Sequence, residues 1–187
     1  MIYILEEKCI WPNNINCIDL QKNNMTLNKD EIKIVFGLVA LALLTRFLPH
    51  PPNFAPITGI ALFTGFNFTN KRLALFIPLF CMLITDFFLG FHSLVPIIYS
   101  CFILISFIGF KAKSLSLLTV IGASFSFFII SNLGVWYLSY PKDLNGLISC
   151  FVLAIPFFFN SLAGDLFYTS LLQFSFNKIK IQSLKTN

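Results

Sequence analysis

Charged side chains are scarce in this sequence. Lysine, arginine, aspartate and glutamate together make up 11% of its 187 residues, whereas soluble globular domains usually contain about 25%. The chain also lacks the phosphate-binding loop of many ATPases and the sequence motifs of zinc metalloproteases and serine hydrolases. We therefore expect neither a water-soluble fold nor an enzyme, and no ATP hydrolysis by that route.

Cysteine patterns that bind metals or build disulfide frameworks are missing as well. The five cysteines, Cys9, Cys17, Cys81, Cys101 and Cys150, form no closely spaced pair, and the last three fall inside apolar stretches where cysteine acts as a small hydrophobic residue. No metal or cofactor is predicted. Basic residues are not interleaved with aromatic ones in any soluble segment, so nucleic-acid binding is not expected either.

Hydrophobic residues, in contrast, are abundant. They make up 57% of the sequence, 24 residues are phenylalanine, and the mean hydropathy is +0.81. A helix needs about 20 residues to cross a membrane, and short segments rich in Pro, Gly, Asn and Lys divide the chain into successive apolar runs. These runs are Ile32–Leu48, Phe54–Phe68, Leu73–Gly90, Leu94–Phe110, Leu115–Leu138 and Leu144–Phe174.

This pattern predicts an all-α, polytopic membrane bundle of six transmembrane helices over residues 32–174. Residues 1–31 are expected to be a disordered or mis-assigned N-terminal extension, with Met25 as an alternative start, because they contain neither a span nor a signal-peptide core. Residues 175–187 are expected to form a basic cytoplasmic tail. The last run, with 31 residues, is longer than a membrane core requires, so we expect it to tilt, to kink at Pro156 or to protrude from the membrane.

The distribution of basic residues predicts the orientation. With the N-terminus inside, only Arg46 and Lys142 of the thirteen basic residues lie outside. Cytoplasmic loops carry the excess of lysine and arginine in membrane proteins. Both termini are therefore predicted to be cytoplasmic, and the protein is expected in the bacterial cytoplasmic (inner) membrane.

Polar residues inside the apolar runs suggest a binding site. A charged group in hydrocarbon costs at least ~2.5–3.5 kcal/mol, so Asp86 and Arg46 each need a partner or a function. We expect both in the outer half of the membrane, within ion-pair reach, in an outward-facing site for a small polar ligand. The candidate ligand-binding residues are Arg46, His50, Asn53, Asp86, His92, Asn132, Trp136 and Asn160. The alternative is structural: Arg46 and Asp86 neutralise each other, and Asn132 joins helices.

Two further features leave alternatives open. Asp165 is expected near the inner edge, where it caps a helix or pairs with Lys71 or Arg72. The second run contains small residues at spacings that allow close helix approach, either within the bundle or to a partner subunit. These small residues are Ala55, Gly59, Ala61 and Gly65.

Four segments carry a resemblance to a known family. They are RFLPHPPNFAPI (46–57), DFFLGFH (86–92), SNLGVW (131–136) and IPFFFN (155–160). Together they resemble an uncharacterised bacterial family of small membrane proteins assigned to transport. That family is distantly similar to the S components of energy-coupling-factor vitamin transporters, and the resemblance covers about Lys33 to Phe174.

The resemblance implies a six-helix protein that binds a vitamin-like molecule from the outer side and works with an ATPase module. One feature departs from the S components, because Gly37, Ala40 and Ala42 do not form the alanine repeat that such proteins use to dock on that module.

The leading hypothesis is therefore small-molecule uptake, with this chain as the binding subunit. Its expected partners are the lipid bilayer, a small polar ligand, and either an energising ATPase module or further copies of itself. Two alternatives remain. One is a structural or assembly subunit of a membrane complex. The other is an intramembrane enzyme that would use His50, Asp86 and His92 as general acid and base.

Overall fold

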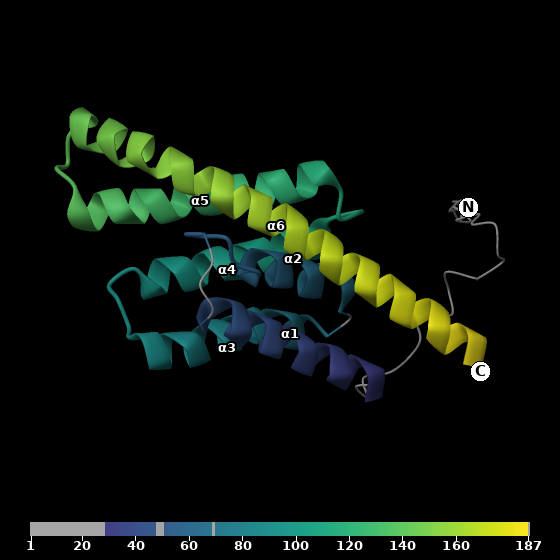
Figure 1. Ribbon diagram of the computed structural model, residues 1–187. Coiled ribbons are helices and arrows are strands. Elements are labelled where there is room, and N and C mark those ends of the chain that lie inside the picture. Colours follow the sequence, from purple (N-terminus) through teal and green to yellow (C-terminus); the bar gives the residue numbers. More distant parts are fainter. Residues whose placement is uncertain (1–28, 48–50, 69, 187) are drawn as a thin grey trace, which may run out of the picture.

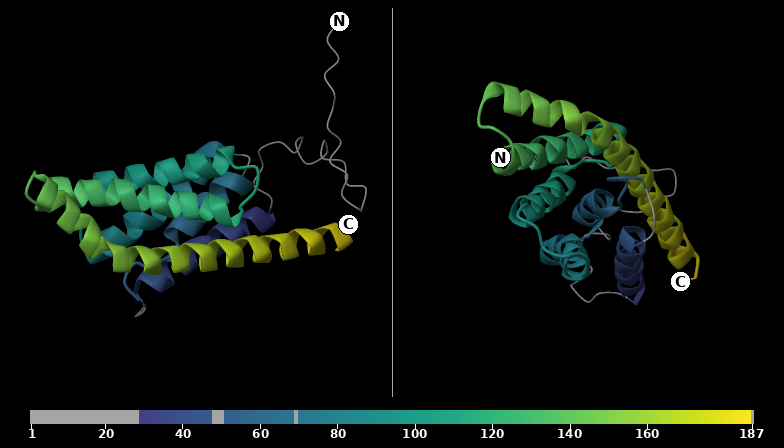
Figure 2. Two further views of the ribbon diagram at one scale, coloured as in Figure 1. Left: turned by 90° about the horizontal axis from the view of Figure 1, so that it is seen from above. Right: turned by 60° about the vertical axis from the view of Figure 1, so that its left-hand side comes forward.

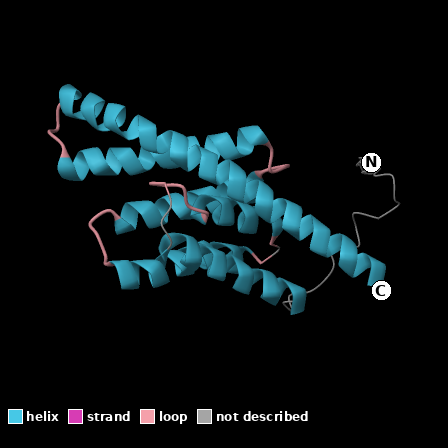
Figure 3. Cartoon of the chain, in the orientation of Figure 1, coloured by secondary structure: helices cyan, strands magenta, loops and turns pink. Residues whose placement is uncertain are grey.

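The computed structural model describes residues 29–47, 51–68 and 70–186, and these residues form six α-helices joined by short loops (Figure 3). The predicted all-α architecture is confirmed, and each observed helix overlaps one of the predicted apolar runs. The helices are α1 (Lys29–Phe47), α2 (Ile57–Asn67), α3 (Lys71–Leu89), α4 (Val95–Lys111), α5 (Leu117–Ser139) and α6 (Leu144–Thr186).

Successive helices run in opposite directions. The α3–α4 turn and the α5–α6 turn lie at one end of the bundle, whereas the start of α1, the α4–α5 turn and the C-terminus lie at the other (Figure 1). Lys71, Lys111 and Lys113 belong to this second end, and Lys142 to the first. The asymmetry in basic residues along the sequence is therefore also an asymmetry in space.

Three helices are long and apolar enough to cross a membrane. They are α3, α5 and the Leu144–Lys178 part of α6, while α2 and α4 are apolar but shorter. Many large apolar side chains of these helices face outward; Phe87 on α3 is 72% exposed and Phe159 on α6 is 63% exposed. Large apolar side chains exposed in such number are typical of helices that face lipid or a partner protein rather than water.

The short helix α2 forms the centre of the bundle. It has 11 residues, and every residue from Ile57 to Gly65 is buried. It packs against α3, α4, α5 and α6. At 1.5 Å per residue it is about 16 Å long, roughly half of the ~30 Å hydrocarbon core.

Glycines allow α2 to approach its neighbours closely. A Cβ atom on Gly59 would lie 3.1 Å from the backbone nitrogen of Thr169 on α6, and one on Gly65 would lie 3.2 Å from Cα of Gly109 on α4. The small residues of the second apolar run therefore serve packing within the bundle. The sequence had left this use and docking of a partner as equal alternatives.

Helix α6 is the longest element and bends along its length (Figure 2). Its helical backbone continues to Thr186, through the segment that the sequence analysis assigned to a tail. Part of this extension contacts α2: the rings of Phe63 and Phe176 are 5.4 Å apart, and Asn67 Nδ2 donates a 3.0 Å hydrogen bond to Gln173 Oε1. These contacts hold the C-terminal part of α6 against the end of α2.

Candidate functional site

A tight turn precedes α2 and determines where Asn53 lies. The backbone nitrogen of Phe54 donates a 3.0 Å hydrogen bond to the carbonyl oxygen of Pro51, and Asn53 has a φ angle of 64°. Proline in the second position and a positive φ in the third characterise a type II turn. Asparagine tolerates this left-handed conformation better than most residues, so the sequence Pro51-Pro52-Asn53-Phe54 forms the turn with little strain.

The segment after this turn packs against the middle of α6. A Cβ atom on Gly164 would lie 3.2 Å from Cα of Phe54, and the rings of Phe54 and Tyr168 are 5.5 Å apart. Glycine at position 164 thus gives the non-helical backbone room to lie directly on the helix.

The segment after the turn lies far along the bundle from the α5–α6 turn, and its Pro56 is fully buried, whereas Pro51, Pro52 and Asn53 are exposed. Asp165, next to Gly164, is hydrogen-bonded to Ser124 on α5. From Ser124 to the end of α5 at Ser139 the helix is about 22 Å long. Non-helical backbone at such depth in a membrane protein is tolerated where protein buries it or where it borders a water-filled cavity. The packing against Gly164 holds this segment in place.

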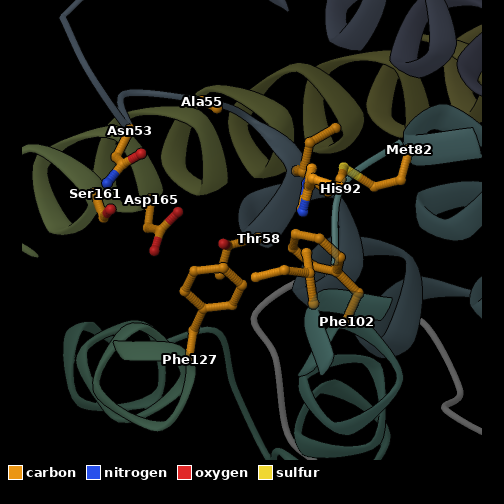
Figure 4. A pocket seen from close by; sticks show the side chains of 11 residues that line it. Asn53, Ala55, Thr58, Met82, His92, Phe102, Phe127, Ser161 and Asp165 are labelled. Atoms are coloured by element: carbon orange, nitrogen blue, oxygen red, sulfur yellow. The ribbon is translucent and has the colours of Figure 1, made fainter. Parts of the chain in front are cut away.

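Two adjoining cavities border this segment. Their volumes are about 300 Å³ and 220 Å³, and Asn53, Ile98, Phe127 and Ser161 line both. The larger is completed by Ala55, Ile57, Thr58, Met82, His92, Phe102 and Asp165 (Figure 4). The smaller is completed by Ser124, Phe128, Ser131, Asn132, Val135, Ala154, Phe157 and Phe158. Apolar walls with a few convergent polar groups are the usual composition of small-molecule sites.

The polar groups of the larger cavity lie mainly along one side. Asp165 is only 3% exposed, and its Oδ2 accepts a 2.6 Å hydrogen bond from Ser124 Oγ. The Thr58 hydroxyl on α2 also hydrogen-bonds this carboxyl group. Ser161 precedes Asp165 by one helical turn, and Figure 4 shows Asn53 beside both. Residues from the turn, α2, α5 and α6 therefore meet at this side.

Aromatic rings form the opposing wall. Phe127 on α5 and Phe102 on α4 have ring centroids 5.4 Å apart. In the smaller cavity the rings of Phe128 and Phe158 are 4.8 Å apart. His92 is exposed and stands at the far end of the larger cavity, beside Met82 (Figure 4). The space between the polar side and the aromatic wall suits a ligand that has both a polar group and a flat apolar body.

Comparison with protein families gives one match. A family of unknown function (DUF6580) matches residues 26–186. The chain belongs to this family. The matched range includes all six helices and every residue named above as lining the two cavities. No significant match is found among curated proteins or among solved structures.

Of the residues that the sequence analysis proposed for ligand binding, the structure brings three to the cavities. Asn53 lines both, His92 lines the larger and Asn132 lines the smaller. The side-chain amide of Asn132 donates a 2.8 Å hydrogen bond to the carbonyl oxygen of Phe128 on its own helix, so part of its hydrogen-bonding capacity is already used.

Three other proposed residues lie outside the cavity linings. Asp86 is 1% exposed, and its Oδ2 accepts a 3.0 Å hydrogen bond from Tyr99 Oη on α4. Trp136 lies at the end of α5, where its Nε1 donates to the carbonyl oxygen of Pro141 at 3.0 Å. Asn160 is half-buried on α6, one position before Ser161, which takes its place in the linings of both cavities.

The proposed Arg46–Asp86 ion pair involves a side chain outside the described part of the structure. The backbone of Arg46 belongs to α1, which packs against α3, the helix of Asp86. His50 also lies outside the described residues. The pair stays a prediction.

The sequence analysis missed the buried acidic residue of the site. Asp165 was expected at the inner edge, capping a helix or pairing with Lys71 or Arg72, but among the described residues its partners are the hydroxyl groups of Ser124 and Thr58. The spacing of Ser161 and Asp165, four residues apart on one helix face, was available in the sequence. Nothing in the sequence indicated that Ser124, more than thirty residues away, faces them.

Proposed function

We propose that this protein is a multi-pass protein of the bacterial cytoplasmic membrane that binds a small polar molecule and serves as the binding subunit of an uptake system. The observation that carries the proposal is the cavity of about 300 Å³ between apolar helices, beside the non-helical segment 53–56. Hydrogen-bonding side chains from four separate segments converge there.

The surroundings of the cavity favour a ligand over a purely structural role. A polar cluster that only joins helices is best satisfied by direct contact between them, because each unsatisfied group in hydrocarbon costs several kcal/mol. Here Asn53 and Ser161 border open space, and Asp165 borders the same space while it accepts the hydrogen bond from Ser124. Small-molecule sites commonly range from about 300 to 1,000 Å³, so the cavity has the volume of a small ligand.

The charge distribution supports the orientation. Lys71, Lys111 and Lys113 lie at the end of the bundle that also holds the C-terminus, which by the positive-inside rule is the cytoplasmic end. The turn of Asn53 and the α3–α4 turn of His92 then open toward the outer side. A ligand would enter from outside the cell.

Uptake driven by ATP would require a second protein. The chain has no phosphate-binding loop, and the resemblance to S components suggests an ATPase module as the partner. The lipid-facing exposure of α3 and α6 leaves room for such a partner or for further copies of this chain.

The proposal is tested by identifying what co-purifies with the protein. The full chain is purified in mild detergent, denatured, and its small-molecule content determined by mass spectrometry. A Ser161→Phe variant fills the wall shared by both cavities. Ser126→Phe is the matched control, because Ser126 lies in a surface groove between α4 and α5.

We expect one compound to accompany the wild-type and Ser126→Phe proteins at near-stoichiometric levels and to be absent from Ser161→Phe. Thermal unfolding shows whether each variant is folded. Asn53→Gly is a second site variant, which removes a side chain from the cavity lining without adding volume. Equal small-molecule content in wild type and in both site variants would contradict the proposal.

A further inference from the structure

Among the described residues, the larger cavity contains a buried acid and no buried base. The described residues that line the two cavities include two ionisable side chains, Asp165 and His92. His92 is exposed at the far end, beside Met82, whereas Asp165 is 3% exposed beside Ser161 (Figure 4). In the described part of the chain, no lysine or arginine is paired with Asp165, and its partners are two hydroxyl groups.

Two hydroxyl groups do not saturate an ionised carboxylate. Such a group has two oxygens and about four acceptor sites. Asp165 therefore retains capacity for another donor, and its position in the cavity lining offers that capacity to the cavity.

The neighbouring helix end compensates part of the charge. Thr58 is the second residue of α2, so Asp165 lies beside the first turn of that helix. The N-terminus of a helix carries a partial positive charge equivalent to roughly half an elementary charge. This arrangement leaves the site with a net negative character, which disfavours anionic ligands and favours cationic ones.

We infer that the cavity binds a small organic cation: a protonated amine or a cationic nitrogen heterocycle whose charged group contacts Asp165 and whose apolar body lies against Phe127. This inference rests on the proposed function and specifies its ligand class. The aromatic wall suits the same chemistry, because Phe127 and Phe102 attract cations through their ring faces and pack against flat apolar groups.

The test uses three probes of similar shape that differ in charge. They are 2-phenylethylamine, 2-phenylethanol and phenylacetate, measured by equilibrium dialysis against the full chain in detergent. Asp165→Asn removes the charge while it keeps the size of the side chain. The matched control is Asp143→Asn, because Asp143 lies in the α5–α6 turn, where its Oδ1 accepts a 2.7 Å hydrogen bond from Gly146 N, and asparagine preserves such a cap.

We expect the amine to bind the wild-type protein about tenfold more tightly than the alcohol, because a charge-assisted hydrogen bond replaces a neutral one. Phenylacetate should bind most weakly. Asp165→Asn should remove the preference for the amine and leave the affinity for the alcohol nearly unchanged, whereas Asp143→Asn should behave as wild type. Each probe partitions differently into detergent, so its uptake by protein-free micelles is measured in parallel and subtracted before the probes are compared.

Equal binding of amine and alcohol to the wild type overturns the cation assignment but leaves the proposed binding function intact. Binding of none of the three probes also overturns the cation assignment, and the proposed binding function is then decided by the small-molecule content of the purified protein. An amine preference that persists in a folded Asp165→Asn protein also overturns the assignment. Should this variant fail to fold, the wild-type probe series decides alone, since it depends on no substitution.

Discussion

Ser124 on α5 and Asp165 on α6 are joined by a 2.6 Å hydrogen bond, although they are 41 positions apart in the chain. Both residues are buried, and both belong to the cavity walls. This bond fixes the position of α6 along its axis relative to α5; these are the two longest helices. It also holds the carboxyl group of Asp165 between α5 and the first turn of α2.

Ser124→Ala should therefore destabilise the protein. Loss of the hydroxyl leaves a buried carboxyl group with one donor fewer, which typically costs about 1–3 kcal/mol. Ser126→Ala is the control, because Ser126 Oγ bonds only the Gly122 carbonyl oxygen of its own helix among the described residues. Thermal unfolding in detergent measures both. Equal stability of the two variants would show that Asp165 does not depend on Ser124.

The contact between α2 and α4 should not tolerate a side chain at Gly65 or Gly109. A Cβ atom on Gly65 would overlap the carbonyl oxygen of Ser106, and one on Gly109 would lie 2.7 Å from that of Leu62. Both obstacles are backbone atoms, so we expect Gly65→Ala to cost about 1–3 kcal/mol by overpacking. Gly122→Ala, on an exposed face of α5 with no atom within 4 Å, should be neutral or stabilising by about 0.5–1 kcal/mol.

These glycine variants are compared by the temperature at which the detergent-solubilised protein unfolds. A Gly65→Ala protein as stable as Gly122→Ala would mean that α2 and α4 do not cross as closely as the structure indicates.

Two substitutions at Asn53 distinguish its role in the conformation of the turn from its role in ligand binding. Asn53→Gly keeps the positive φ at no steric cost and removes the amide from both cavities. It should preserve stability and weaken binding of the co-purifying molecule. Asn53→Ala removes the same amide and also strains the backbone by about 1–2 kcal/mol. Unfolding and ligand content are measured on both; a fully loaded Asn53→Gly protein would exclude Asn53 from ligand contact.

The two ends of the bundle should face opposite sides of the membrane. Ser93 lies in the α3–α4 turn and Lys113 in the α4–α5 turn, and both are exposed. In a variant without native cysteines, Ser93→Cys should react with an impermeant thiol reagent added to intact cells, and Lys113→Cys should react only after the cells are opened. The reverse pattern would invert the proposed orientation.

The amino-acid sequence by itself determined the helices and their order. Apolar runs separated by Pro, Gly and basic residues set the boundaries to within a few positions, except for the end of α6, which continues twelve residues past the predicted Phe174. Helix formation in an apolar chain depends on local hydrogen bonding and local breakers. It also determined the separation of basic residues between the two ends, since alternating helix direction follows from short connections. Asn53, His92 and Asn132 entered the candidate site for the same local reason: they are polar residues near the ends of apolar runs.

The tertiary structure alone decided which helix faces meet. Neighbouring positions on a helix point about 100° apart, so a choice between Asn160 and Ser161 requires knowing where α5 and the Asn53 turn lie. The position of the segment after that turn depends on contact with Gly164, far along the chain. Asp165 became a cavity residue because Ser124 and Thr58, from two other helices, surround it. Contacts between residues distant in sequence leave no periodic trace in a single chain, and for this reason only the packed bundle shows them.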